Sequence, residues 1–450
     1  MGSTQTVGRL MGVDGLSCGA VNGHSIADIR LARPYNGTVR YRGSTASSMD
    51  GRITQAAAHD EQHCLSHFKS LSYYRPELDV LRFAAFSMVF ASHTVPGDEA
   101  FYSQLHIAPA VSRLIIAMGA SGAFGVDLFF ALSSFLITTL LLREQETYGT
   151  IDISSFYLRR VLRIWPLYFF FLLLIAPALD QLLPTATMPM RYVLAFTLLA
   201  GNWACVLWGY PNSVAVPLWS VSIEEQFYLV WPIVMRWIRH LKTVALMLLL
   251  LSFIVRAILV GRGAVHPQIW CNTLARLDPI ACGTLLAVLA HRREINIATG
   301  MRVALLVASL GLLAAVGRFG DFVGAKALLT FPVATVASIL LLLCALGWRM
   351  PSRPGRIGRT LIYLGRISYG LYVFHSLFIV LFGVSSTHDA VARLASVVAA
   401  LLATIAAAAI SHHLLEKPFL RLKERVTRIG SRPGPIGYTD QRTRKREWCR

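Results

Sequence analysis

The stretch that decides the fold is residues 75–93, RPELDVLRFAAFSMVFASH, a largely apolar run in which Arg82 and His93 stand eleven positions apart. Arg82 and His93 are about three helical turns apart, so they share one helix face and lie roughly 16 Å apart along its axis. Ionisable groups inside a membrane-spanning helix are costly and normally face a protein interior or a wet cavity. The stretch therefore predicts a functional pair within a membrane domain. The alternative to a functional pair is that both residues are structural: Arg82 extends its charged end to the membrane surface, and His93 is a hydrogen-bonded core residue.

The composition of the whole chain agrees with a membrane location. Of 450 residues, 55% are hydrophobic and only 15% are charged, and the mean hydropathy is +0.53. Such a chain has too few polar side chains to cover one soluble globule. The formal net charge of +19 comes from Lys and Arg in short clusters between apolar runs. This arrangement predicts contact with anionic lipid and a fixed membrane topology rather than a nucleic-acid partner.

Cysteine and histidine spacing gives little indication of a metal site. The seven cysteines are scattered without any CxxC spacing, so we expect neither a zinc site nor a disulfide framework. His59, His63 and His67 stand at spacing four and would line up on a helix, with Cys64 among them. Because no carboxylate or cysteine pattern completes that group, the sequence predicts no metal.

Apolar segments of about 18 to 24 residues recur from residue 78 onward, the length that crosses a hydrocarbon core as a helix. They predict an all-α, polytopic membrane protein with about ten transmembrane helices. The expected spans are 78–97, 123–142, 164–181, 218–238, 243–260, 271–290, 301–317, 328–347, 361–383 and 391–414. An eleventh apolar run, 192–208, is expected to be re-entrant or shallow.

The distribution of Lys and Arg indicates that the eleventh apolar run, 192–208, does not cross the membrane. If 192–208 crossed the membrane, the basic clusters at 236–242, 291–294 and 349–366 would all fall outside. If it does not cross, these clusters lie in cytoplasmic connections, as the positive-inside rule requires. The sequence therefore predicts ten membrane crossings with both termini in the cytoplasm.

Three parts of the chain follow from this pattern. Residues 1–72 are rich in Gly, Ser, Arg and His without periodicity and are expected to form a poorly ordered N-terminal extension. Residues 73–416 form the predicted transmembrane domain, and 417–450 form a basic cytoplasmic tail. The tail leaves no room for an appended catalytic domain.

Charged residues at the ends of the predicted spans are candidates for a site. Arg160 and Arg163, at positions i and i+3 of FYLRRVLRIWP, lie on one helix face and can grip a phosphate, although arginines there also serve as topology anchors. Asp127 lies among phenylalanines and needs a partner or a proton. Its structural alternative is an ion pair with an arginine such as Arg82.

A second carboxylate pair lies in LWSVSIEEQFYLVWP, residues 218–232. Glu224 and Glu225 point about 100° apart on a helix, so at most one faces the cavity that His93 would share. In the predicted topology, the carboxylates and His93 lie toward the outside and the arginines toward the cytoplasm. This layout predicts a cavity with a basic binding end and a reactive end.

Taken together, these stretches resemble the acyltransferase-3 family of integral membrane acyltransferases. The resemblance covers about residues 73–424 in unbroken order and includes GVDLFFALSSFLIT, RISYGLYVFHSLF (366–378) and LLEKPFLRL (414–422). It departs from the family pattern at Ser134, where the family usually has a glycine, and we expect tighter packing there.

The resemblance implies transfer of an acyl group, usually acetyl from acetyl-CoA, to a hydroxyl of a surface polysaccharide, lipopolysaccharide or other glycolipid. Arg82, Arg160 and Arg163 would hold the phosphates of the acyl-CoA donor. His93 would act as general base, and either Asp127 or Glu224 would orient it. A covalent acyl-imidazole intermediate is an open alternative.

Other interpretations stay open at this point. His375, in YVFHSLF, is expected to be a packing or hydrogen-bonding residue rather than a second catalytic group, and Glu416 a helix-end residue. A transporter or flippase of a lipid-linked sugar would also bury ionisable groups, although the chain shows no paired halves. A scaffold without activity is a third class. The acceptor can also be a small-molecule metabolite, whereas the absence of an appended esterase-like domain weighs against the two-domain members that modify peptidoglycan. The oligomeric state is not indicated.

Overall fold

The computed structural model describes residues 73–425 except 183–187, 294, 319–321, 349, 352 and 388. These residues belong to the larger of two compact units, Cys64–Arg450. The described part is all-helical and contains no β-strand, as the sequence predicts. The expected N-terminal extension with His59, His63 and His67, and the end of the basic tail, lie outside the described residues.

The helices follow one another with short connections. The first half contains α2 (Pro76–Thr94), α3 (Glu99–Gln104), α4 (Pro109–Ser121), η2 (Gly122–Phe124), α5 (Gly125–Tyr148), α6 (Ile153–Phe170), η3 (Phe171–Ile175), α7 (Ala176–Leu182), α8 (Met190–Thr197), α9 (Gly201–Trp208) and α10 (Leu218–Trp237). The second half contains α11 (Leu241–Gly261), η4 (Leu274–Arg276), α12 (Leu277–Ala290), α13 (Thr299–Arg318), η5 (Gly324–Lys326), α14 (Ala327–Leu346), α15 (Arg356–Arg366), α16 (Ser368–Leu381), α17 (Ala390–Ser411), η6 (His412–Glu416) and α18 (Lys417–Arg425).

Several of these helices are long and apolar enough to cross a membrane. Among the described residues, six helical stretches qualify by length and composition: Pro109–Tyr148, Ile153–Leu179, Leu241–Gly261, Thr299–Arg318, Gly324–Leu346 and Ala390–Lys423. The pair α15 and α16 adds a seventh if the 75° bend between them lies within one span. These helices are compatible with a polytopic membrane protein, and the count of ten crossings stays a prediction. Helix α2 carries three charged side chains, and α12 has only 14 residues.

The predicted re-entrant or shallow run, 192–208, forms two short helices rather than one long one. Helices α8 and α9 have eight residues each and are separated by a break at 198–200. Eight residues extend only about 12 Å, whereas the hydrocarbon core is about 30 Å thick. Neither helix can cross a bilayer by itself. A segment that the sequence left as a connection, 109–121, forms α4 and continues through η2 into α5.

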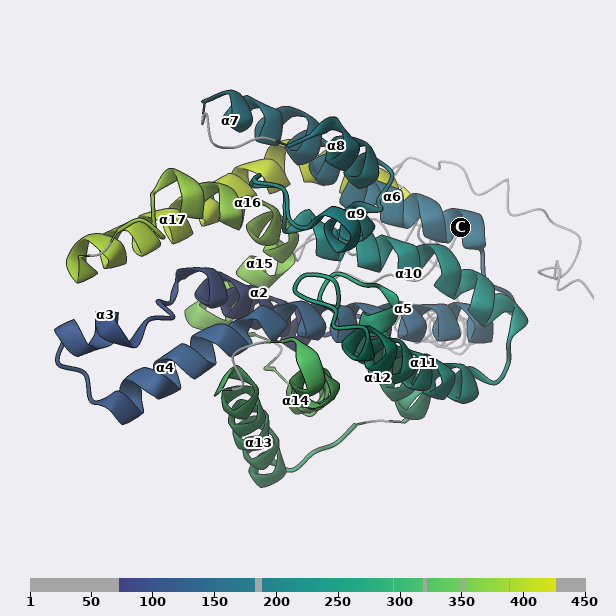
Figure 1. The fold of residues 1–450 in the computed structure, drawn as a ribbon. Coiled ribbons are helices and arrows are strands. Elements are labelled where there is room, and N and C mark those ends of the chain that lie inside the picture. The colour runs from purple at the N-terminus through teal and green to yellow at the C-terminus, as the bar shows by residue number, and fades with distance from the viewer. Residues whose placement is uncertain are drawn as a thin grey trace, which may run out of the picture. The chain divides into compact units, whose positions relative to one another are not determined.

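Helices α2 and α5 lie side by side at the centre of the described unit (Figure 1). Glycines permit this close approach, because a Cβ at Gly122 or Gly125 would collide with the backbone carbonyls of Met88 or Ala85 on α2. Helix α15 also packs closely on α2, with Gly365 against the backbone of Asp79. Helix α5 in turn packs against α12, α14 and α10. These contacts fix the two helices that carry Arg82, His93 and Asp127.

Ser134, the departure from the family pattern, lies at the contact between α5 and α12. Its side chain is fully buried and donates a hydrogen bond to the Ala131 carbonyl at 3.1 Å. A Cβ at Gly283 of α12 would collide with the Ser134 hydroxyl, so the glycine on the facing helix makes room for the serine. The serine is thus closely packed against α12.

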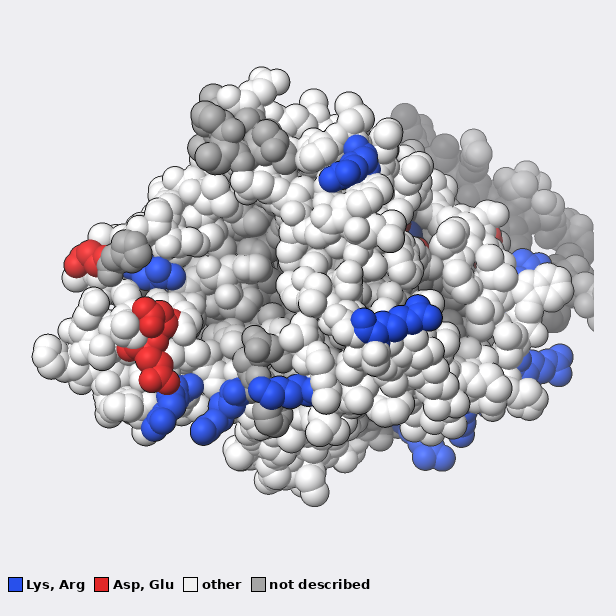
Figure 2. Space-filling model, in the orientation of Figure 1, with Lys and Arg blue, Asp and Glu red and all other residues white. Residues whose placement is uncertain are grey.

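The outer surface of the described unit is largely apolar. Figure 2 shows a face on which Lys, Arg, Asp and Glu appear at only a few places. Large exposed side chains on α11, α13 and α17 are mostly leucine, isoleucine, valine and methionine. Such a surface suits lipid contact, since soluble proteins rarely expose large contiguous apolar areas.

Candidate active site

One cavity collects most of the predicted donor-binding residues. It has a volume of about 150 Å³ and lies between α2, α5, α6, α10 and the junction of α15 with α16. Its charged lining residues are Arg75, Arg82, Arg160, Arg163, Arg366, Asp79 and Glu224. Arginines outnumber carboxylates by three, so the cavity is strongly cationic. The cavity thus brings Arg82 of α2 together with Arg160 and Arg163 of α6, which lie about 80 positions further along the chain.

A hydrogen-bonded cluster forms one wall of this cavity. Arg82 Nη1 lies 3.0 Å from Asp79 Oδ1, and the Tyr74 hydroxyl donates to Asp79 Oδ2 at 3.0 Å. Arg366 donates to the Tyr74 hydroxyl at 2.9 Å and lies 3.7 Å from Asp79. Burial, and then the nearby Asp79 carboxylate, raises the pKa of the Tyr74 phenol, which therefore stays protonated at neutral pH. Asp79 holds both guanidinium groups at the cavity.

Helix α6 supplies two of the arginines. The helix begins after Asp152, whose side chain accepts a hydrogen bond from the Ser155 N–H, a standard N-cap. Arg159 forms a buried salt bridge with Glu144 at 3.0 Å, whereas Arg160 and Arg163 line the cavity. Arg160 Nε is buried without a hydrogen-bond partner. A buried donor without a protein partner is costly, so this atom is available to a water molecule or a ligand in the cavity.

Only one carboxylate of the Glu224–Glu225 pair reaches the cavity, as the helical geometry predicts. Glu224 lines the cavity and accepts a hydrogen bond from the Tyr228 hydroxyl at 2.7 Å. The Tyr228 hydroxyl is also 2.5 Å from Ser133 Oγ on α5. Glu225 instead accepts a hydrogen bond from Trp165 Nε1 on α6 at 3.0 Å.

His93 lies beyond the cavity, in the last turn of α2. Its side chain is exposed on one side, and its ring centroid lies 5.3 Å from that of His375 on α16. His375 is fully buried, and its ring is 5.4 Å from that of Tyr372. Tyr372 lines the cavity, donates to the Pro217 carbonyl at 3.0 Å and lies 2.6 Å from Ser220 Oγ. His93 is thus separated from the arginine cavity by Tyr372 and His375.

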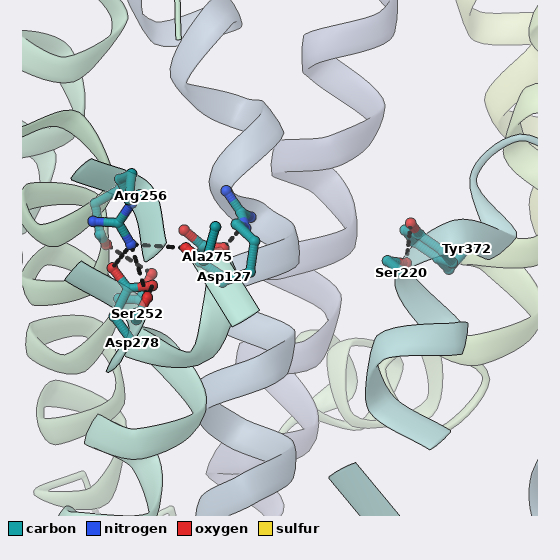
Figure 3. Close-up of polar contacts among 10 residues, drawn as sticks. Asp127, Ser220, Ser252, Arg256, Ala275, Asp278 and Tyr372 are labelled. Carbon is teal, nitrogen blue, oxygen red and sulfur yellow. Dashed lines mark hydrogen bonds and ion pairs between the residues drawn. The ribbon is translucent and has the colours of Figure 1, made fainter. Parts of the chain in front are cut away.

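Asp127 belongs to a different buried cluster (Figure 3). It forms an ion pair with Arg276, and both side chains are buried. Next to this pair, Arg256 Nη2 lies 2.7 Å from Asp278 Oδ2 and also donates to Ser252 Oγ at 3.0 Å. The structural alternative for Asp127, an ion pair with an arginine, is therefore present, but the partner Arg82 was wrong. In the described part of the chain, neither Asp127 nor Glu224 hydrogen-bonds to His93.

The guanidinium of Arg276 also contacts aromatic rings. Its Cζ atom lies 4.3 Å from the ring centroid of Trp270 and 4.7 Å from that of Phe331. Cation–π contacts of this kind partly replace lost hydration. The four charges of Asp127, Arg276, Arg256 and Asp278 cancel, so α5, α11 and α12 are joined by a neutral ionic cluster within the apolar interior.

Comparison with known protein families shows which family this chain belongs to. A sequence profile described as an acyltransferase domain, that of the acyltransferase-3 family, matches residues 75–413. The chain belongs to the acyltransferase-3 family. The match contains all six residues that the sequence singled out for donor binding and catalysis.

Two curated relatives from this comparison are peptidoglycan O-acetyltransferase OatA of Listeria monocytogenes and O-acetyltransferase OatA of Staphylococcus aureus. The chain is 27% identical to the first over 208 residues, which is 43% of this chain and 33% of the relative. It is 26% identical to the second over 223 residues, which is 47% of this chain and 37% of the relative. The chain thus spans about a third of the length of these relatives. No solved structure matches.

Sequence reasoning missed or undervalued several residues of this acyltransferase-3 domain. The sequence pattern predicts a topology role for Arg366, yet this residue lines the cavity. The pattern assigns no role to Arg256 or Arg276, although a lone arginine within the apolar run LSFIVRAILV indicates an internal partner. His375, which the sequence predicts to be a packing residue, packs on His93. Glu416 lies in η6 with its Oε2 atom 3.7 Å from His412 Nδ1, near a helix junction.

Among the described residues, no group of three or more His, Cys, Asp or Glu side chains has the geometry of a metal site. Cys205, Cys271, Cys282 and Cys344 are all free thiols.

Proposed function

We propose that this chain is a multi-pass membrane O-acyltransferase that transfers an acetyl group from acetyl-CoA to a hydroxyl of a surface glycan. The observation that carries the proposal is the cavity between α2, α6 and α15, in which arginines from three helices converge. Coenzyme A carries a diphosphate and a 3′-phosphate, and arginine recognises phosphate through charge-assisted, bidentate hydrogen bonds. Membership of the acyltransferase-3 family supports the same reaction class.

The cavity would hold only part of the donor. Its volume is about 150 Å³, whereas sites that enclose a whole drug-sized ligand measure roughly 300–1,000 Å³. The phosphate-bearing part would contact Arg82, Arg160 and Arg163, and Arg366 adds a further cation beside Asp79. The pantetheine arm would extend toward Tyr372 and the two histidines, and the adenosine would remain outside the cavity.

Donor binding should depend on Arg160. Replacing Arg160 with glutamine removes a charged donor from the cavity, and a hydrogen bond to a charged group contributes about 1.5–3 kcal/mol. We expect the dissociation constant for acetyl-CoA to rise about 10- to 100-fold, measured by equilibrium binding to the purified protein in detergent. Arg239→Gln, at an exposed position, is the matched control and should bind as tightly as the wild type. Equal weakening in both variants, or in neither, would contradict the donor site.

In the proposed reaction, His93 acts as general base. It takes the proton from the acceptor hydroxyl while the hydroxyl oxygen attacks the thioester carbonyl carbon, and the thiolate of coenzyme A then leaves. An imidazole suits this step because its ordinary pKa lies near neutrality. The exposed side of His93 is open to an acceptor, and on its other side the rings of His375 and Tyr372 lie between His93 and the cavity. The proposed reaction therefore requires these two rings to move aside so that the thioester can reach His93.

We further propose ten crossings, with both termini in the cytoplasm of a bacterial cell and the domain in the inner membrane. The support is the concentration of arginine at one end of the predicted spans and the shortness of α8 and α9. In this orientation, the arginine cavity opens toward cytoplasmic acetyl-CoA and His93 lies toward the outside.

Peptidoglycan is the acceptor that we favour within the class of surface glycans. The relative from Listeria monocytogenes is named for peptidoglycan, and this name supports the choice. The comparisons therefore do not support the sequence-based expectation that weighed against peptidoglycan, and they do not favour lipopolysaccharide over other glycans.

Mass spectrometry of surface glycans from cells with and without the protein tests this function. We expect one glycan to lose an acetyl ester, which mild base removes, when the gene for the protein is deleted. Restoring the wild-type chain should restore the ester. If every glycan keeps its esters while a lipid-linked sugar accumulates on the inner side, the flippase interpretation would replace the acyltransferase.

A further inference from the structure

The base in the proposed reaction needs a partner that fixes its tautomer. A neutral imidazole has one protonated and one unprotonated ring nitrogen, and a hydrogen bond donated by the N–H fixes which nitrogen of His93 is free to take a proton. The two carboxylates expected in this role are engaged elsewhere, Asp127 with Arg276 and Glu224 with Tyr228. The partner must therefore be sought among the groups that pack on His93.

His375 is the polar side chain whose ring packs on His93. It is 0% exposed, and its Nδ1 atom lies 2.5 Å from the Tyr372 carbonyl oxygen. A carbonyl oxygen only accepts hydrogen bonds, so Nδ1 carries a proton. A second proton on Nε2 would create a buried cation, which is costly without a paired carboxylate. His375 is therefore neutral, and its Nε2 atom is a hydrogen-bond acceptor.

That acceptor lacks a partner in the structure. His375 Nε2 is buried and makes no hydrogen bond, although burying an unsatisfied polar atom costs about 1–3 kcal/mol. Three rings contact His375: those of Phe86, Tyr372 and His93. Phe86 has no polar hydrogen, and the Tyr372 hydroxyl already donates to the Pro217 carbonyl. His93 is the one of the three whose N–H is free to donate.

We infer that His375 is a positioning residue for His93. A modest rotation of the partly exposed His93 ring brings one of its N–H groups to His375 Nε2. This hydrogen bond holds the tautomer in which the other His93 nitrogen is unprotonated and faces the acceptor hydroxyl. Once His93 has taken the proton, the His375 lone pair stabilises the imidazolium. A neutral acceptor performs this role without burying a negative charge in the apolar interior.

Two variants of His375 separate positioning from packing. In His375→Asn, the amide nitrogen can replace Nδ1 and keep the hydrogen bond to the Tyr372 carbonyl, but nothing occupies the place of Nε2. In His375→Gln, the longer side chain brings an amide oxygen near the place of Nε2, where it can accept from His93. Both residues are polar, uncharged and no larger than histidine, so the two variants differ mainly in the acceptor offered to His93.

The experiment measures acetyl transfer by purified wild type and variants in proteoliposomes, with acetyl-CoA as donor and a soluble peptidoglycan fragment as acceptor. We expect His375→Asn to lower kcat about 10- to 100-fold, the size of effect seen when a metal-ligating histidine loses the group that orients it. The KM for acetyl-CoA should stay unchanged in both variants because the arginine cavity is intact. His375→Gln should retain kcat within about 3-fold of the wild type, since the orienting bond is kept.

Several outcomes would overturn the inference. If both variants keep the wild-type kcat, or if both lose it equally while binding acetyl-CoA normally, His375 does not position His93. If His375→Asn does not accumulate, His375→Gln decides alone: a loss as large as that of His93→Ala would contradict the inference.

The inference rests on the proposed function, and the two can fail separately. If the wild type transfers no acetyl group and His93→Ala changes nothing, the proposed function fails. If the wild type is active and needs His93, but His375→Asn and His375→Gln behave alike, only the positioning role fails.

Discussion

Replacing His93 with alanine is expected to reduce acetyl transfer about 100- to 10,000-fold, the usual contribution of a general base, while the protein still accumulates in the membrane. The ring is exposed on one side and lies in the last turn of α2, so its removal leaves no cavity in the core. The acetyl-CoA dissociation constant should not change, because His93 does not line the arginine cavity. The measurement is the ester content of surface glycans together with the amount of protein in isolated membranes.

His240→Ala serves as the control for this experiment. His240 is an exposed histidine at the start of α11, and its side chain makes no capping hydrogen bond. We expect it to support wild-type ester content. If His93→Ala retained wild-type transfer, His93 would not be the base, and the histidine pair would have only a structural role.

Replacing Asp127 with alanine is expected to destabilise the protein by about 3–5 kcal/mol, because it leaves the guanidinium of Arg276 buried without its counter-charge. Arg276 is fully buried, and its Nε and Nη1 atoms already lack hydrogen-bond partners. The expected result is a sharply lower level in the membrane and a lower midpoint of thermal unfolding in detergent. Loss of transfer in this variant would follow from loss of folded protein.

The double variant Asp127→Leu/Arg276→Met tests whether the unpaired charge of Arg276 causes the loss of stability. Replacing both partners of a buried pair by apolar side chains is often neutral or stabilising, so we expect most of the stability to return. The pair Glu146–Arg292 is largely exposed, and Glu146→Ala should cost less than about 1 kcal/mol. If Asp127→Ala were as stable as the wild type but inactive, Asp127 would instead take part in catalysis.

The sequence predicts those parts of the site that lie within single helices. The i, i+3 spacing of Arg160 and Arg163 places both at one cavity, and the 100° angle between Glu224 and Glu225 admits only Glu224. The all-helical fold and the apolar, membrane-type composition are equally local properties. The family resemblance is confirmed over residues 75–413, which the family profile matches, whereas the motif LLEKPFLRL at 414–422 lies beyond the matched range.

Contacts between distant helices could not be predicted in this way. Arg276 pairs with Asp127 from 149 positions away, and Arg366 reaches Tyr74 from 292 positions away. Helical periodicity says which face a side chain occupies, but not which other helix that face meets. For the same reason, the sequence predicts an arginine as the alternative partner of Asp127 without indicating Arg276, and it predicts a carboxylate beside His93 where the structure places His375.

The central claim is that acetyl-CoA held by the arginine cavity donates its acetyl group to a glycan hydroxyl activated by His93. Its most direct test is to supply acetyl-CoA labelled in the acetyl group to purified protein in proteoliposomes that also contain a soluble peptidoglycan fragment. The account predicts base-labile label on the glycan with the wild type and almost none with His93→Ala. It would be contradicted if the wild type left all label on coenzyme A, or if His93→Ala labelled the glycan as fast as the wild type.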